Sequence, residues 1–276
     1  MNFTASEDYC GDARVIQHSF IKHHINKLGL RREDTVLDVG CGTGEETAWI
    51  AKGVKFITAI DNSEEMLAVA AESNSVCNVA YFKCDAQTVG DNPDWREKFD
   101  KVVCFYVLHW VPDELEAIRS ISKCLKSAGE ALFIIDGQDD NFVLLQATSF
   151  LKGHKKWGPY VKDYQSQLRQ WTRSASDTEE VFKACGWERA NCEVRQHEVY
   201  LSETQFKLFM KTCLGETPLI PAADQEDYLQ DLWQWGMECS KDKSRAESYR
   251  FTTFLWSSTL LNKLSQVRFS KQGKVI

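Results

Sequence analysis

The sequence predicts an α/β fold built on a mainly parallel, seven-stranded sheet with helical cap insertions. Three observations favour this class. Strand and helix patterns alternate over the first two thirds of the chain, a buried strand runs into a glycine-rich turn at 40–44, and an aromatic-rich helical stretch interrupts the alternation at 138–173. Such alternation is typical of a parallel sheet with helices on its faces. We therefore expect a single domain over 1–276.

Each element of this fold has its own signal. Apolar or β-branched runs predict strands at 35–39, 56–60, 79–83, 101–107, 131–135, 193–201 and 250–260. Helical spacing of apolar residues covers 11–29, 44–51, 113–125, 176–185 and 221–237, and a further helix opens at Ser63. Ser63 is an N-cap candidate, and Ser202 with Gln205 has the form of a capping box. The domain then divides into an N-terminal helical cap (1–30), a core (31–136), a helical insert (137–175) and the rest of the sheet with additional cap helices (176–276).

Composition excludes several classes of protein. The chain of 276 residues has a net charge of −7, and its basic segments 152–156 and 268–274 are typical of solvated loops, so we expect no nucleic-acid partner. Ten cysteines form no C-x-x-C pair, and six histidines have no zinc spacing, which predicts reduced thiols and no metal. The polar N-terminus and the short apolar runs indicate a cytoplasmic protein without a membrane span, as a monomer or homodimer.

The turn after the first strand is the strongest site signal. It reads Asp38-Val39-Gly40-Cys41-Gly42-Thr43-Gly44. Glycines let the backbone turn sharply and let a ligand approach without a Cβ in the way. The spacing G-x-G-x-G differs from the dinucleotide motif and lacks the G-K-[ST] of a phosphate loop, which favours a ligand with an amino-acid moiety and a ribose. Asp38, Gly40, Cys41, Gly42 and Gly44 are the candidate binding residues here.

Polar residues follow the next strands at their carboxyl ends. Asp61 ends the second strand about twenty residues after the glycines, where a carboxylate can accept hydrogen bonds from both ribose hydroxyls. Asp85, after the third strand, can accept one from an adenine amino group, with Asn62 and Ala86 beside the ring. Phe105, in the fourth strand, is expected to complete the same site.

These motifs together resemble a known family. VLDVGCGTG at 36–44, IDNSEEML at 60–67 and the D-A step at 85–86 are similar to the class I S-adenosylmethionine-dependent methyltransferases over about 31–136. The resemblance implies a Rossmann-like fold and S-adenosyl-L-methionine as the methyl donor. A nucleotide-binding or noncatalytic Rossmann domain is the alternative at this point.

The segment after the fourth strand resembles a smaller group within this family. Phe105-Tyr106-Val107-Leu108-His109-Trp110 resembles the juvenile hormone acid O-methyltransferases and, more distantly, plant carboxyl methyltransferases. The resemblance implies that Gln17 and Trp110 hold the substrate carboxylate. The chain departs from the family pattern between Tyr9 and Gln17, where it lacks the usual Asn-Ser pair. His109 could act as a base if the acceptor were a phenol or an alcohol, or could bond locally at the strand end.

The expected reaction is esterification of a small apolar acid, such as juvenile hormone acid or farnesoic acid. A carboxylate is ionised at pH 7 and needs no general base, so catalysis is mostly positioning. Phe142, Trp157 and Tyr160 are candidates to line an apolar substrate pocket, although such aromatics also serve ordinary helix packing. The alternatives are methylation of another small acid such as aconitate, with Arg14 and Arg169 on a second carboxylate, methylation of a phenol, or a noncatalytic binding module.

Overall fold

The sheet has seven strands in the order β3-β2-β1-β4-β5-β7-β6. The computed structural model describes residues 8–137, 143–166, 168–240 and 248–261, with the backbone alone from 252 to 261. The strands are β1 (Thr35–Val39), β2 (Phe56–Asp61), β3 (Val79–Lys83), β4 (Phe99–Phe105), β5 (Leu125–Asp136), β6 (Arg189–Leu201) and β7 (Tyr249–Leu261). Strands β1 to β5 pair in parallel, whereas β7 pairs antiparallel with both β5 and β6. The α/β Rossmann-like class is confirmed, and the parallel pairing is confined to five strands.

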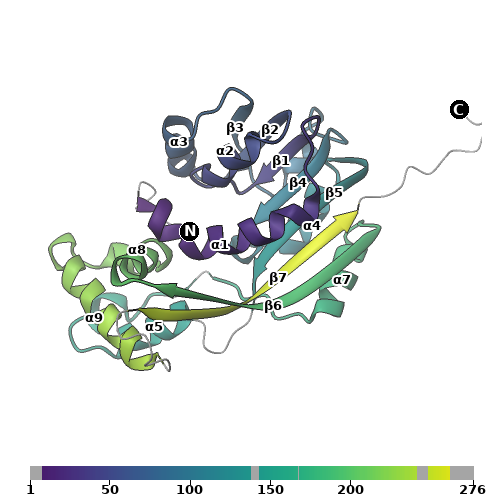
Figure 1. Cartoon of the computed structure of the whole chain (residues 1–276). Coiled ribbons are helices and arrows are strands. Elements are labelled where there is room, and N and C mark those ends of the chain that lie inside the picture. The colour runs from purple at the N-terminus through teal and green to yellow at the C-terminus, as the bar shows by residue number, and fades with distance from the viewer. Residues whose placement is uncertain (1–7, 138–142, 167, 241–247, 262–276) are drawn as a thin grey trace, which may run out of the picture.

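Helices cover the sheet and build a cap at one end of it. They are α1 (Val15–His24), α2 (Glu45–Ala51), α3 (Glu64–Ser73), α4 (Glu114–Ser122), α5 (Val143–Gly153), α6 (Gly158–Val161), α7 (Ala175–Ala184), α8 (Glu203–Cys213) and α9 (Gln225–Cys239). In Figure 1, α5, α8 and α9 gather around the far ends of β6 and β7, while α1 crosses the molecule between this cap and the side that carries α2 and α3.

Local capping signals are confirmed where the sequence placed them. The Ser63 hydroxyl accepts a hydrogen bond from the backbone N–H of Met66 at 3.2 Å, and so begins α3. Ser202 and Gln205 form the reciprocal capping box of α8. These bonds satisfy N–H groups that have no partner inside the helix.

The core lies on both faces of the sheet. Successive strand residues point to opposite faces, so Val36 packs in one cluster and Leu37 in the other. The Val36 cluster includes α1 side chains such as Phe20, and the Leu37 cluster includes α4 side chains such as Ile118. A third cluster belongs to the cap and is centred on buried side chains such as Tyr228. The sheet is thus held from both sides, and the cap has a hydrophobic core of its own.

The end of β4 differs from the prediction. The strand ends at Phe105 rather than at 107, because Tyr106 adopts a left-handed backbone conformation with φ 59°. A 3-10 turn, η5 (Leu108–Trp110), follows at once. A left-handed conformation is uncommon for a residue other than glycine and is found at binding and active sites.

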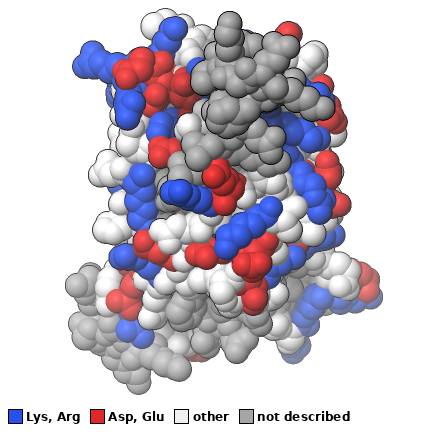
Figure 2. Space-filling view, turned by 90° about the vertical axis from the view of Figure 1, so that its right-hand side faces the viewer, with Lys and Arg blue, Asp and Glu red and all other residues white. Residues whose placement is uncertain are grey.

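The surface carries both signs of charge. On the face shown in Figure 2, Lys and Arg side chains are interspersed with Asp and Glu side chains. No helix within the described part of the chain is long and apolar enough to cross a membrane.

Candidate active site

The glycine turn after β1 folds back onto β2. The backbone N–H groups of Gly40 and Cys41 both donate to the carbonyl of Ile60, at 2.8 and 3.0 Å. Gly40 and Gly42 have φ of 72° and 55°, which favours glycine at both. A Cβ on Gly40 would lie 2.2 Å from a methyl carbon of Val107, whereas one on Gly42 would meet nothing within 4 Å. Open space therefore lies beside the turn at Gly42.

Asp61 ties this turn to the end of β2. One carboxylate oxygen accepts from the backbone N–H of Gly42 at 2.9 Å, and the other accepts from that of Ser63 at 2.9 Å. Burial raises the pKa of the Asp61 carboxyl, and the backbone hydrogen bonds oppose that rise. Each carboxylate oxygen has two acceptor sites, so capacity for a ligand remains.

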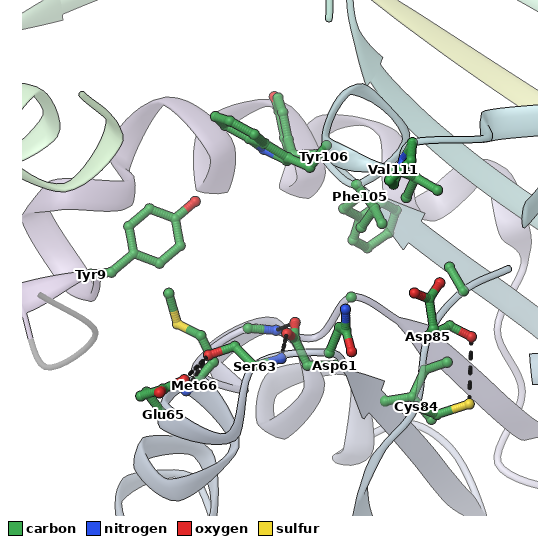
Figure 3. A pocket seen from close by; sticks show the side chains of 18 of the residues that line it. Tyr9, Asp61, Ser63, Glu65, Met66, Cys84, Asp85, Phe105, Tyr106 and Val111 are labelled. Carbon is green, nitrogen blue, oxygen red and sulfur yellow. Dashed lines mark hydrogen bonds between the residues drawn. The ribbon is translucent and has the colours of Figure 1, made fainter. Parts of the chain in front are cut away.

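A cavity of about 330 Å³ opens at this edge of the sheet (Figure 3). Its walls come from the carboxyl ends of β1, β2, β3 and β4, which is where ligands bind in open α/β sheets. Asp85 lies at one side with Phe105 and Val111 across from it, and Tyr9 points its hydroxyl into the space from the other side (Figure 3). The cavity combines carboxylates, an aromatic face and apolar side chains.

The structure brings most of the predicted binding residues together. Those that line this cavity are Gly40, Gly42, Asp61, Asn62, Asp85, Ala86 and Phe105. Asp38, Cys41 and Gly44 are not among its lining residues. Asp38 accepts a hydrogen bond from the Thr47 hydroxyl at 2.6 Å, and burial raises its pKa to about 7. We assign these three to the support of the turn, since Asp38 holds α2 in place and Cys41 is buried in the core.

Two N-terminal residues complete the cavity wall. Tyr9 and Arg14 both line it, and the Arg14 guanidinium lies over the Tyr9 ring at 4.9 Å. Arg14 pairs with Glu46 at 2.8 Å, yet its Nε and Nη1 atoms are buried with no hydrogen-bond partner among the described residues. The sequence predicts for Arg14 only contact with a second substrate carboxylate, and it predicts no binding role for Tyr9.

Trp110 stands between the first cavity and a second one. The second cavity has about 350 Å³, and Trp110 is the residue that lines both. Its walls come from α5, from Tyr164, Ser166 and Leu168, and from the end of α8 with the turn that follows it. Tyr106 lines the first cavity beside Trp110, and its hydroxyl is buried without a partner among the described residues. Tyr106 belongs to the F-Y-x-L-H-W segment, for which the resemblance implies a substrate carboxylate ligand only at Trp110.

Gln17 and His109 are buried near this junction without lining either cavity. The Gln17 amide nitrogen donates to the Tyr9 hydroxyl at 3.4 Å, and its carbonyl oxygen has no partner among the described residues. Burial lowers the pKa of His109 to about 3, so its ring is neutral at pH 7. Through its hydrogen bond to the Tyr9 hydroxyl, Gln17 contacts a residue that lines the first cavity.

The aromatic residues predicted to bind substrate lie elsewhere. Trp157 is fully buried in the cap core and donates its indole N–H to Asp231 at 2.8 Å. Tyr160 is 45% exposed on the cap surface. Phe142 lies outside the described residues. Neither Trp157 nor Tyr160 is among the residues that line the two cavities, and we do not retain them as substrate ligands.

Arg169 is not among the residues that line either cavity. Its backbone N–H donates to the carbonyl of His109, and its guanidinium donates to the carbonyl of Pro112. Arg14 and Arg169 therefore do not form a shared carboxylate site. The described residues also contain no group of three or more His, Cys, Asp or Glu side chains arranged to hold a metal ion.

Comparison with known proteins identifies the family. A methyltransferase domain matches residues 37–133. The juvenile hormone acid O-methyltransferase of Bombyx mori is 25% identical over 218 residues, which are 76% of this chain and 77% of that protein. A ubiquinone biosynthesis O-methyltransferase of Pseudomonas fluorescens is 31% identical over 176 residues, which are 60% of this chain and 72% of that protein.

A solved structure supports the fold. The YcgJ protein of Bacillus subtilis matches with a TM-score of 0.60 at 17% identity, covering 89% of this chain and 99% of that one. The matching domain at 37–133 includes the glycine turn and Asp61. The chain belongs to the class I S-adenosylmethionine-dependent methyltransferases and is an enzyme of that class.

Proposed function

We propose that this enzyme methylates the carboxylate of a small, largely apolar acid. The observation that carries the proposal is the junction at Trp110, a residue that lines both the cavity beside the glycine turn and a second cavity under the cap. A donor in the first cavity and an acid in the second would bring their reacting groups together at this residue. Positioning of this kind can lower a barrier by up to about 7–11 kcal/mol.

The first cavity fits S-adenosylmethionine. Asp61 would accept from the ribose hydroxyls, and Asp85 with Asn62 would hold the adenine against Phe105. The Nε and Nη1 atoms of Arg14 have no hydrogen-bond partner among the described residues, although Nη1 lies 4.0 Å from Glu45, and they would bind the carboxylate of the amino-acid part of S-adenosylmethionine. When bound, this molecule supplies an electrophilic methyl group on a sulfonium. The chain supplies the side chains that orient it.

A carboxylate acceptor fits the residues around the junction. No His or Lys side chain is among the described residues that line either cavity. A phenol or an alcohol needs a base to remove its proton, whereas an acid is already ionised at pH 7. His109 has a neutral ring but is not exposed to either cavity, which favours an acid over a phenol.

Neutral donors at the junction would hold the substrate carboxylate. The indole N–H of Trp110 is one, and the buried hydroxyl of Tyr106 is another. Gln17 would orient the Tyr9 hydroxyl through their 3.4 Å contact, which makes it a positioning residue. Neutral donors orient the oxygens without placing a full positive charge beside the nucleophile.

The second cavity favours a substrate with an apolar body. Leu144, Leu168, Leu214 and Leu219 line it, and no Lys or Arg does so among the described residues. A polycarboxylic acid such as aconitate would bring a second carboxylate into this cavity without a cation to pair with it. The relation to the Bombyx mori enzyme, which extends over 76% of this chain, also favours an acid of the juvenile hormone acid or farnesoic acid type.

The test is transfer of a labelled methyl group from S-adenosylmethionine to farnesoic acid, juvenile hormone acid, medium-chain fatty acids, aconitate, a benzoate and a phenol. We expect a base-labile ester from the apolar acids and its loss in Trp110→Ala. Transfer to the phenol alone would overturn the carboxylate assignment. Tight donor binding with no transfer to any acceptor would instead favour a noncatalytic module.

A further inference from the structure

The second cavity contains a buried carboxylate that the proposed reaction does not use. Glu216 lines this cavity and is 1% exposed. No ion pair between described residues includes Glu216, and the charge of Lys152 acts on it only from a longer distance, although a buried charge without an ion pair is costly. One carboxylate oxygen accepts from the Thr148 hydroxyl at 2.5 Å. Burial raises the pKa of Glu216, and the Thr148 hydrogen bond opposes this rise.

The local fold does not explain why Glu216 is there. It is the N-cap residue of η6 (Thr217–Leu219), but its side chain makes no capping hydrogen bond. Glutamate is not among the residues favoured at an N-cap, so the start of this turn does not require it. The Glu216 side chain turns to Thr148 of α5 instead and so lies on the cavity wall. The position of the Glu216 side chain therefore favours contact with a molecule bound in the cavity over a role in the turn.

Other polar groups gather on the same wall. The Tyr164 hydroxyl lies against Gly215, where an added Cβ would be 2.0 Å from the hydroxyl oxygen. Tyr164 and Gly215 both line the cavity, as do Thr148 and Glu216. The wall is therefore assembled from three separate segments, and a glycine is needed for their close approach. A cavity meant only for hydrocarbon would gain nothing from these groups, since each loses hydration there.

We propose that Glu216 accepts a hydrogen bond from a donor group, a hydroxyl or an amine, on the part of the acid that lies away from its carboxylate. This inference rests on the proposed function, in which the carboxylate of the acid lies at Trp110 and its apolar body lies in the second cavity. The cavity then selects an acid whose body is apolar and whose distal part bears one donor. Thr148 positions the Glu216 carboxylate by donating to its other side.

Matched acids test this selection. Decanoic acid would be compared with its ω-hydroxy, ω-amino and ω-methoxy derivatives, or with the homologous series at whichever chain length binds best. Dissociation constants would be measured by calorimetry in the presence of S-adenosylhomocysteine, and methyl transfer would be measured in parallel. We expect the hydroxy or the amino acid to bind about ten-fold to hundred-fold more tightly than the plain and methoxy acids.

Variants assign the effect to Glu216. Glu216→Leu should abolish the preference and improve binding of the plain acid. Glu216→Gln should retain the preference for a hydroxyl and lose one for an amine, which separates the two donors. Thr148→Val should weaken the preference partly, and Glu226→Gln, at a carboxylate whose side chain is 82% exposed, should leave it unchanged. Donor binding and circular dichroism would show that each variant folds.

The outcomes separate this inference from the proposed function. Equal binding of all four acids at each chain length, or a preference that survives in Glu216→Leu, would overturn the inference while ester formation continued. Preference for the methoxy acid would overturn it too, because an acceptor would then be recognised. A Glu216-dependent preference in binding with no methyl transfer to any acid would leave the inference standing and defeat the proposed function.

Discussion

The two cavities differ in where their walls come from. The first is built mainly from loops at one edge of the sheet, all within residues 40–112, together with Tyr9 and Arg14. The second joins α5, the residues Tyr164, Ser166 and Leu168, and the end of α8 with the turn after it, and shares Trp110 with the first. Local backbone signals place the first set, because parallel strands end at a common edge. The residues of the second cavity are brought together by packing between segments that are distant in the sequence, and no short sequence motif predicts them.

The two regions also use their aromatic side chains differently. In the sheet region, Phe105 and Tyr106 face a cavity. In the cap, Trp157, Phe209 and Trp233 are buried in a core of their own and line neither cavity. Aromatic residues of the cap therefore serve mainly its packed core, and of the cap's described aromatic side chains Tyr164 is the one that lines the second cavity.

The largest expected effect comes from emptying the cap core. Trp157→Ala removes a fully buried indole and its hydrogen bond to Asp231, and we expect the free energy of unfolding to fall by about 3–5 kcal/mol. Tyr160→Ala, at an exposed site, should change it by less than about 0.5 kcal/mol. Urea denaturation would measure both. Equal effects of the two substitutions would contradict the distinction between cap core and cap surface.

The next effect concerns the sheet region. Asp61→Asn weakens the hydrogen bonds that Asp61 accepts from Gly42 and Ser63 and those expected from the ribose, so affinity for S-adenosylmethionine should fall about hundred-fold. Calorimetry would measure the dissociation constant. Asp91→Asn, at a carboxylate paired with Lys123 on the surface, serves as the matched control. A change of less than three-fold in Asp61→Asn would place the ribose elsewhere.

A smaller effect is expected at the junction of the two regions. Trp110→Phe keeps an aromatic ring and removes one N–H donor to the substrate, so kcat/KM for the acid should fall about ten-fold. The dissociation constant of S-adenosylmethionine should stay within two-fold. Steady-state kinetics and calorimetry together separate these readouts. If donor affinity fell and kcat/KM for the acid did not, Trp110 would belong to the donor site alone.

The smallest effect concerns the contact between α1 and α2. The carboxylates of Glu45 and Glu46, at 3.1 and 2.9 Å from Nε2 of His18, accept from its ring and raise the pKa of His18 to about 9, against burial and the nearby Arg14. A raised pKa of this kind contributes stability below about pH 6.5, and this contribution is lost as the pH rises through 9. Thermal unfolding between these values should show the loss in the wild type and not in His18→Gln. His23→Gln, at an exposed site, should behave as the wild type does.

The features that could be predicted from the sequence are those of local structure. The alternation of strands and helices, the Ser63 cap and the capping box at Ser202 depend on neighbours in the chain, and all are confirmed. The glycine turn could be placed because positive φ restricts the residue type. The left-handed Tyr106 that ends β4 could not be predicted, since nothing in its own identity favours that conformation.

The positions of the buried cap residues could not be predicted from the sequence, for a physical reason. Glu216 lies in a short Gly-Glu-Thr-Pro stretch that is typical of a surface turn, and only its contact with Thr148, 68 positions away, shows that it is buried. Trp157 was expected in a substrate pocket because its residue type is compatible with either a pocket or a core. Which of the two it joins depends on packing between distant helices.

The most direct test of the account is a crystal structure with S-adenosylhomocysteine and the acid that is methylated best. We expect the donor product beside the glycine turn with its ribose at Asp61, the substrate carboxylate at the Trp110 indole N–H, and the apolar body in the cavity between α5 and the end of α8. An acid bound away from Trp110, or one that leaves the second cavity empty, would contradict the proposal that the two cavities meet there to bring donor and acid together.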